Sequence, residues 1–133
     1  MQLNSFYITT PIYYVNDIPH LGHAYTSVVS DTLARYKKLN NYKVFFSTGT
    51  DEHGQKVENS ALDKGQDTKS FTDSVSQRFK MLTGTLNLIN NDFIRTSEDR
   101  HKKQVTKVWK ELVDKGEIYL DDYEGWYSVR DES

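Results

Sequence analysis

The chain has 133 residues, no cysteine and a formal net charge of −2. This length suits one compact domain with its own core, and the lack of cysteine excludes disulfides, thiolate metal sites and thiol nucleophiles. No apolar run approaches the roughly 20 residues that span a membrane, and Met1–Phe6 lacks a signal-peptide pattern. We therefore expect a folded, cytoplasmic protein with no membrane partner.

The first third of the chain predicts a strand, a rigid loop and a helix. Ser5–Thr10 is rich in aromatic and β-branched residues, as in a buried strand, and Pro11–Pro19 contains both prolines of the chain. From Leu21, residues on one face recur at helical spacing until Asn40 and Asn41 end the pattern. This face comprises Leu21, Tyr25, Val28, Val29, Thr32, Tyr36 and Leu39.

The middle of the chain predicts a second strand, a loop and two helices. Lys43–Ser47 has the composition of a strand, Thr48–Gly54 is a polar loop with two glycines, and Gln55–Asp63 fits a short helix. Asp67 or Thr68 can cap the longer helix that follows. The apolar stripe of that helix is Phe71, Val75, Phe79, Leu82 and Leu86.

The last third predicts an extended link at Asn90–Thr96, a helix that Gly116 ends, and a pair of strands. The strands are expected at Glu117–Leu120 and Glu124–Val129, with a turn between them. The helix contains the basic segment Arg100–Lys115, which has six basic and two acidic residues. The apolar face of the helix is Val105, Val108, Trp109, Leu112 and Val113.

The order strand, helix, strand, helix indicates a parallel sheet with right-handed crossovers, hence an open α/β fold. In such folds ligands bind beyond the carboxyl ends of the strands. Two loops lie at that edge of the predicted sheet, Pro11–His23 and Thr48–His53.

Three of the four histidines lie in these loops, and His20 and His23 stand at the predicted start of a helix. Pro19 suits such a start, because its missing N–H costs nothing there. A helix N-terminus offers unpaired N–H donors to a phosphate, and Gly22 lets a ligand approach the backbone. Two imidazoles on this edge can stabilise charge when the α-phosphorus of a nucleoside triphosphate is attacked.

Other uses of these side chains rank lower. His20 and His23 could hold a metal together with His53 or Asp51, but no second-shell pattern supports this. A triad of Ser47, His53 and Asp51 lacks a nucleophile-elbow sequence. Asp51 can pair with a substrate ammonium group or serve as a helix cap, and the local sequence favours neither.

Four motifs, in order along the chain, resemble those of the methionyl-tRNA synthetase family. Ile8–His23 reads ITTPIYYVNDIPHLGH and resembles the family's opening segment, and Gly49–Lys56 reads GTDEHGQK and resembles its second catalytic loop. Phe93–Thr96 (FIRT) and Tyr123–Tyr127 (YEGWY) are similar to two further landmarks. The resemblance extends from about Phe6 to Tyr127 and is strongest to the bacterial or organellar branch.

The resemblance implies a class I aminoacyl-tRNA synthetase. Its fold would be the first half of a Rossmann-like nucleotide-binding domain in residues 1–115, then the start of an inserted α+β connective domain in 116–133. The enzyme would join methionine to AMP using ATP and Mg²⁺, release pyrophosphate, and transfer the methionyl group to tRNA(Met). The resemblance implies that His20, Gly22 and His23 bind ATP. It also implies that the two histidines stabilise the transition state of adenylation.

Three further residues fall where the family binds methionine. Ile12 and Tyr14 would form part of an apolar, aromatic wall that suits a thioether. Asp51 would hold the α-amino group. Without the resemblance, packing within the loop is the simpler role for Ile12 and Tyr14.

The chain departs from the family in two ways. Many relatives begin a zinc knuckle with two cysteines where this chain has Ser128 and Asp131, so we expect no metal site and no zinc in this segment. The signature Lys-Met-Ser-Lys-Ser is also absent, and family members are several times longer. We therefore expect an N-terminal fragment that is inactive by itself.

Two other interpretations remain open. A complete small nucleotidyltransferase would use the same His-x-Gly-His device and would have about this length. A non-catalytic module would bind a tRNA backbone through the outward side chains of Arg100, Lys102, Lys103, Lys107 and Lys110, although such charge runs are usually solvated faces. The sequence does not determine the oligomeric state.

Overall fold

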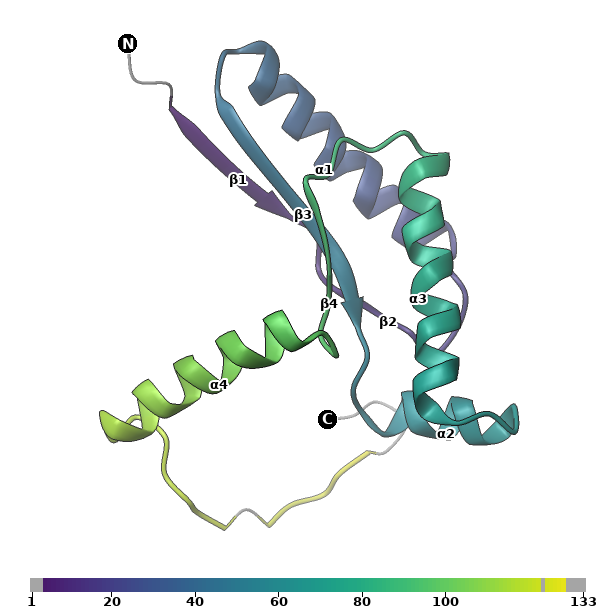
Figure 1. The fold of residues 1–133 in the computed structure, drawn as a ribbon, viewed down its shortest axis with the longest axis vertical. Helices are drawn as coiled ribbons and strands as arrows, with labels where there is room; N and C mark the ends of the chain where they lie inside the picture. Colours follow the sequence, from purple (N-terminus) through teal and green to yellow (C-terminus); the bar gives the residue numbers. More distant parts are fainter. Residues whose placement is uncertain (1–3, 123, 129–133) are drawn as a thin grey trace. The chain divides into compact units, whose positions relative to one another are not determined.

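The computed structural model describes residues 4–122 and 124–128 (Figure 1). It has the predicted α/β architecture, and every strand pair in its sheet is parallel. The chain divides into two compact units, residues 1–102 and 103–133. The elements in chain order are β1 (Ser5–Thr9), β2 (Tyr13–Tyr14), α1 (Leu21–Leu39), β3 (Lys43–Asp51), α2 (Gln55–Asp63), α3 (Thr68–Thr85), β4 (Asp92–Arg95) and α4 (Asp99–Asp114).

The central strand of the sheet is β3. Its Ser47 is in register with Thr9 of β1 and also with Asp92 of β4, so β1 and β4 lie on opposite sides of it. β2 continues on the side of β1, because Thr50 is in register with both Tyr13 and Arg95. Successive right-handed crossovers in one direction place their helices on one side of a sheet, and Figure 1 shows α1 and α3 on the same side.

The predicted polar loop Thr48–Gly54 is wrong in its first half, since β3 continues to Asp51. The reason is pairing with a distant strand. A Cβ atom on Gly49 would lie 2.1 Å from the carbonyl oxygen of Ile94, so glycine is required for β4 to come this close. The extended link predicted at Asn90–Thr96 contains this strand, β4.

The predicted loop Pro11–Pro19 is likewise interrupted by β2. The backbone N–H of Thr10 donates to the carbonyl of Ser47 at 3.2 Å, and that of Val15 donates to Asp51 at 3.3 Å. The chain therefore follows the edge of β3 almost without a break before it turns into α1.

The helix predicted from Leu21 is confirmed as α1, and Asn40 is its C-cap. Asn41 follows at a φ of 60°, the left-handed conformation that ends helices. The face named above is nevertheless exposed, with Leu21 at 85% and Leu39 at 83% of full exposure. The face that packs on the sheet is small and polar: Ser27, Ser30, Asp31 and Ala34.

Both helices predicted in the middle of the chain are confirmed. Of the two candidate caps for α3, Asp67 is the one used, and its carboxylate accepts the N–H of Ser70 at 3.0 Å. Three residues of the predicted stripe of α3 are buried and build the core with α2, β2 and the residue after β2. This core comprises Tyr13, Val15, Val57, Ala61, Phe71, Val75 and Phe79.

After β4, the predicted helix is confirmed as α4, and Gly116 follows at a φ of 75°. The predicted strand pair is wrong for the described residues 117–122 and 124–128, which form no strand. Tyr123 and Val129 lie outside the described residues. An isolated two-stranded hairpin is only marginally stable in water, so an alternating sequence is not enough to form one.

No helix in the described part of the chain is long and apolar enough to cross a bilayer.

Candidate active site

The two histidines predicted to bind phosphate build the first turn of α1. His20 is the N-cap, and its Nδ1 accepts the N–H of Gly22 at 3.0 Å. The Nδ1 of His23 accepts the N–H of His20, also at 3.0 Å. This is a reciprocal capping box made of imidazoles, and it satisfies two donors that a helix start otherwise leaves unpaired.

Gly22 has a role at this turn that its sequence context did not indicate. A Cβ atom there would lie 2.9 Å from Cε1 and 3.1 Å from Nδ1 of the His20 imidazole. The absent side chain therefore lets the His20 ring fold back over the turn and cap it. That the same absence lets a ligand approach the backbone stays a prediction.

The capping bonds determine which ring nitrogens remain available. A nitrogen that accepts an N–H bond does not carry a proton, so we assign the proton of each neutral ring to Nε2. Burial and the neighbouring His20 lower the pKa of His23, whose ring centroid lies 3.8 Å from that of His20. The pair thus offers two Nε2–H donors, and His23 stays neutral at pH 7.

Tyr13 packs against His23, and no sequence pattern had marked this tyrosine as a site residue. Its hydroxyl bonds to the hydroxyl of Ser27 at 2.9 Å and donates to the carbonyl of His23 at 3.4 Å. Its ring stacks on Phe79 with centroids 5.5 Å apart, and both rings meet the His23 imidazole edge-on. His23 is therefore held by β2 and α3 as well as by its own helix, α1.

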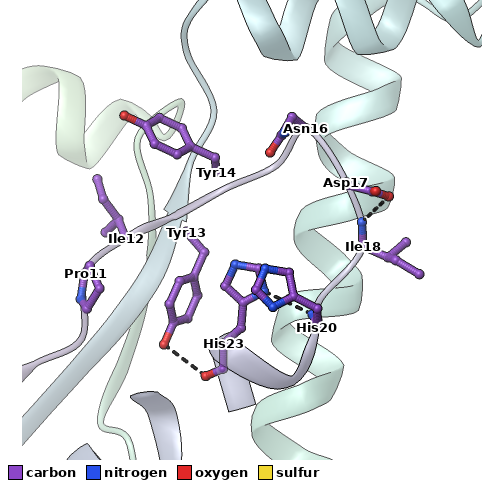
Figure 2. A pocket seen from close by; sticks show the side chains of 9 residues that line it. All are labelled: Pro11, Ile12, Tyr13, Tyr14, Asn16, Asp17, Ile18, His20 and His23. Carbon is purple, nitrogen blue, oxygen red and sulfur yellow. Dashed lines mark hydrogen bonds between the residues drawn. The ribbon is translucent and has the colours of Figure 1, made fainter. Parts of the chain in front are cut away.

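Tyr13, His20 and His23 border a pocket of about 540 Å³ between the segment after β1 and the start of α1 (Figure 2). Ile12 and Tyr14 lie on one side of the segment, while Tyr13 points to the other side, toward His23. The pocket is lined by Pro11, Ile12, Tyr13, Tyr14, Asn16, Asp17, Ile18, His20 and His23. Four of the six predicted site residues are in this lining, namely Ile12, Tyr14, His20 and His23.

Asp51 ends β3 in register with Tyr14, so the two side chains project from the same face of the sheet. It does not cap α2, whose N-cap is Gly54 without a side-chain hydrogen bond. Oδ1 of Asp51 lies 3.4 Å from the N–H of His53 and 3.4 Å from the hydroxyl of Thr96. No hydrogen bond from a described residue reaches Oδ2.

Beside Asp51 lies a charge cluster that the sequence did not indicate. The side chain of Glu52 is fully buried, and Arg95 donates to both of its oxygens, at 2.6 and 3.0 Å. Although burial alone raises a carboxyl pKa, the bonds from Arg95 and Ser97 hold the pKa of Glu52 below its usual range. Arg95 also pairs with Asp73 of α3.

The alternatives to phosphate binding gain nothing from the geometry. Among the described residues there is no group of three His, Cys, Asp or Glu side chains placed to hold a metal ion. Ser47 is buried in the middle of β3, and no hydrogen bond within the described part of the chain joins it to the His53 imidazole. Asp131, one of the two positions compared with a zinc knuckle, lies outside the described residues.

Two residues of the basic segment Arg100–Lys115 form ion pairs within the protein. Arg100, predicted to point outward, donates to both oxygens of Asp92 and to Glu98. Lys107 lies 3.9 Å from Glu111 on the same helix, an exposed pair. These pairs fit the solvated-face interpretation of Arg100–Lys115.

Comparison with known proteins gives concordant matches. The family described as tRNA synthetases class I (M) matches residues 6–133. A methionine–tRNA ligase of Rickettsia bellii is 59% identical over 130 residues, and one of Listeria monocytogenes is 52% identical over 131. A solved methionyl-tRNA synthetase of Mycobacterium tuberculosis, in complex with methionyl-adenylate, superposes with a TM-score of 0.94 at 43% identity.

These matches cover nearly all of this chain but a small part of each relative. The two curated ligases match 98% of the chain, which spans 26% and 20% of their own lengths. The solved structure matches 98% of the chain, which spans 26% of it. The predicted Rossmann-like class I fold is thereby confirmed, and the interpretation as a small nucleotidyltransferase finds no support.

Proposed function

This chain belongs to the family of class I tRNA synthetases for methionine, and we propose on this basis that it forms part of the catalytic domain of a methionine–tRNA ligase. Such an enzyme activates methionine with ATP and then esterifies tRNA(Met), in the cytoplasm. Because the chain spans about a quarter of its Rickettsia relative, the remaining substrate contacts belong to other parts of the enzyme.

We propose that ATP binds at the start of α1. A carboxylate oxygen of methionine attacks the α-phosphorus, the bond from that phosphorus to the bridging oxygen breaks, and pyrophosphate leaves with the electron pair. Negative charge grows on the phosphate oxygens as this happens. The Nε2–H groups of His20 and His23 are held ready to donate to these oxygens, and such preorganised donors stabilise the transition state more than the ground state.

We propose that methionine binds at the neighbouring surface formed by Ile12, Tyr14 and Asp51. Ile12 and Tyr14, on one side of the segment between β1 and α1, offer an apolar wall to the thioether (Figure 2). Oδ2 of Asp51 is available to the α-ammonium group. The register of Tyr14 with Asp51 brings these two subsites to adjacent strands.

Mg²⁺ would enter with the triphosphate. It prefers oxygen ligands and keeps several waters, so phosphate oxygens can supply most of its coordination.

The structural observation that supports this proposal is the imidazole capping box, because it engages Nδ1 of each ring and leaves Nε2–H as the donor. The test is a hybrid ligase, in which this chain replaces the matched 130 residues of the Rickettsia bellii enzyme. We expect methionine-dependent exchange of pyrophosphate into ATP within about tenfold of the parent enzyme's rate, a loss of up to about 1.4 kcal/mol in transition-state stabilisation. A folded hybrid without exchange activity would refute the proposal.

A further inference from the structure

We propose that Thr96, at the end of β4, is a positioning residue that orients Asp51 toward the ammonium group of the amino-acid substrate. This inference rests on the proposed function, since it takes Asp51 as the group that binds the ammonium. Thr96 itself touches no substrate in this arrangement and acts through Asp51.

The hydroxyl of Thr96 lies between two groups of β3 and the loop after it. Its oxygen accepts the backbone N–H of Glu52 at 2.9 Å. With the oxygen so engaged, its hydrogen points to Oδ1 of Asp51, 3.4 Å away. That separation is long for an O–H···O bond, and we expect it to shorten when a cation occupies Oδ2, as bonds in empty sites commonly do.

A second donor reaches the same oxygen, and this determines which oxygen is left for the substrate. The backbone N–H of His53 also lies 3.4 Å from Oδ1. Both donors therefore hold one side of the carboxylate, and Oδ2 receives no hydrogen bond from any residue in the described part of the chain. In this orientation Oδ2 is the oxygen that we expect to meet the ammonium group.

Thr96 is buried and its neighbours are hydrogen-bonded, which defines the position of its hydroxyl. Thr96 is 6% exposed, and its N–H donates to the carbonyl of Thr50 at 3.2 Å. On its two sides in sequence, Arg95 and Ser97 both bind the buried carboxylate of Glu52. The end of β4 and the end of β3 are thus joined at three consecutive residues, and the middle one faces Asp51.

A purely structural role for Thr96 makes a different prediction. Replacing the hydroxyl by a methyl group leaves the N–H of Glu52 unpaired and destabilises the sheet. If Thr96 had only this role, the substitution would weaken the binding of every ligand of the site. A positioning role affects ligands that carry an ammonium group, because Asp51 serves that group alone.

The experiment compares Thr96→Val and Thr96→Ser in the hybrid ligase, with Thr72→Val as the matched control. Thr72 is also buried, but its hydroxyl donates to the carbonyl of Lys69 within α3. We expect Thr96→Val to raise the methionine KM about tenfold, as for loss of a hydrogen bond that involves a charged group. The KM for ATP should stay within about twofold, and Thr96→Ser should restore the methionine KM. Thr96→Ala replaces the Val variant if that variant does not fold.

The decisive ligand is methionine without its amino group, 4-(methylthio)butanoate, measured as a competitive inhibitor. Its inhibition constant should change by less than about twofold in Thr96→Val, and Thr96→Val should have no further effect on methionine in an Asp51→Asn background. Equal losses for both ligands, no loss for either, or failure of Thr96→Ser to restore the KM would overturn the proposal.

This outcome is separable from failure of the proposed function. A hybrid that lacks exchange activity before any substitution contradicts the function and not the positioning. In that case crystal structures of the hybrid and its Thr96→Val variant still decide the question. We expect the Asp51 carboxylate to turn away from its present orientation in the variant, and an unchanged carboxylate would overturn the inference.

Discussion

The backbone N–H of His20 donates to Nδ1 of His23 at 3.0 Å, so the second histidine completes the helix cap that the first begins. Each imidazole thereby uses its Nδ1 in the helix cap, and the proposed function uses its Nε2–H as a donor to ATP. The candidate chemistry and the stability of α1 depend on the same two side chains, and substitutions can separate these two roles.

The capping role of His23 predicts that His23→Ala destabilises the chain by about 1 kcal/mol, because the N–H of His20 loses its partner. His23→Gln should recover most of this loss, since glutamine at the same helix position reaches back to the same N–H. Urea unfolding of the 133-residue chain measures both values. Equal stability of the Ala variant and the unaltered chain would show that the bond contributes nothing.

Gly22 and Gly84 form a matched pair of helical glycines. A Cβ atom at Gly22 would crowd the His20 imidazole, whereas one at Gly84 of α3 meets nothing within 4 Å. Gly84→Ala should therefore stabilise the chain by about 0.5–1 kcal/mol, through helix propensity. Gly22→Ala should show no such gain and should lower adenylate formation in the hybrid ligase. A gain of the same size at both positions would argue against the crowding of His20.

The lowered pKa of His23 predicts how stability depends on pH. The unfolded chain binds a proton at this residue near pH 6.5, while the folded chain binds it at lower pH. Stability should therefore fall as the pH drops below about 6.5, until the folded pKa is reached. Unfolding free energies between pH 7.5 and 5 should show a shallower slope in His23→Gln, and identical slopes would contradict the assignment.

Arg95 and Lys69 both pair with Asp73, but only Arg95 also serves the buried Glu52. Arg95→Ala leaves that carboxylate without its cation and should cost about 3–5 kcal/mol. Lys69 is 84% exposed, and Lys69→Ala should cost about 0.3–0.5 kcal/mol as an ordinary pair on a helix surface. Urea unfolding separates the two values, and a small loss for Arg95→Ala would mean that Glu52 finds other partners.

Features that depend on neighbouring residues in sequence could be predicted. The helices α1, α2, α3 and α4 follow from their spacing and caps. The place of His20 and His23 follows from a strand, a loop and a helix start within a short stretch. Their mutual capping could not be predicted, because it depends on the ring positions that Gly22 permits.

Features that depend on distant pairing could not be predicted. Thr48–Asp51 is polar and contains a glycine, and it is a strand because β4 approaches Gly49 closely. Thr96 bonds to Asp51 from 45 positions away, and no local pattern marks it. The exposed face of α1 is a different case. Its apolar spacing indicates a buried helix, and the Rickettsia relative is about four times as long as this chain, so we expect further parts of a protein of that length to cover it.

The central claim is that His23 donates to a phosphate as charge develops during adenylate formation. Its most direct test is single-turnover formation of methionyl-adenylate by the hybrid ligase and its His23→Ala variant at saturating ATP and methionine. The account predicts that the rate falls about 10²–10³-fold, as for loss of one preorganised donor, while the dissociation constant of ATP changes less than about threefold. An unchanged rate, or a loss confined to ATP affinity, would contradict it.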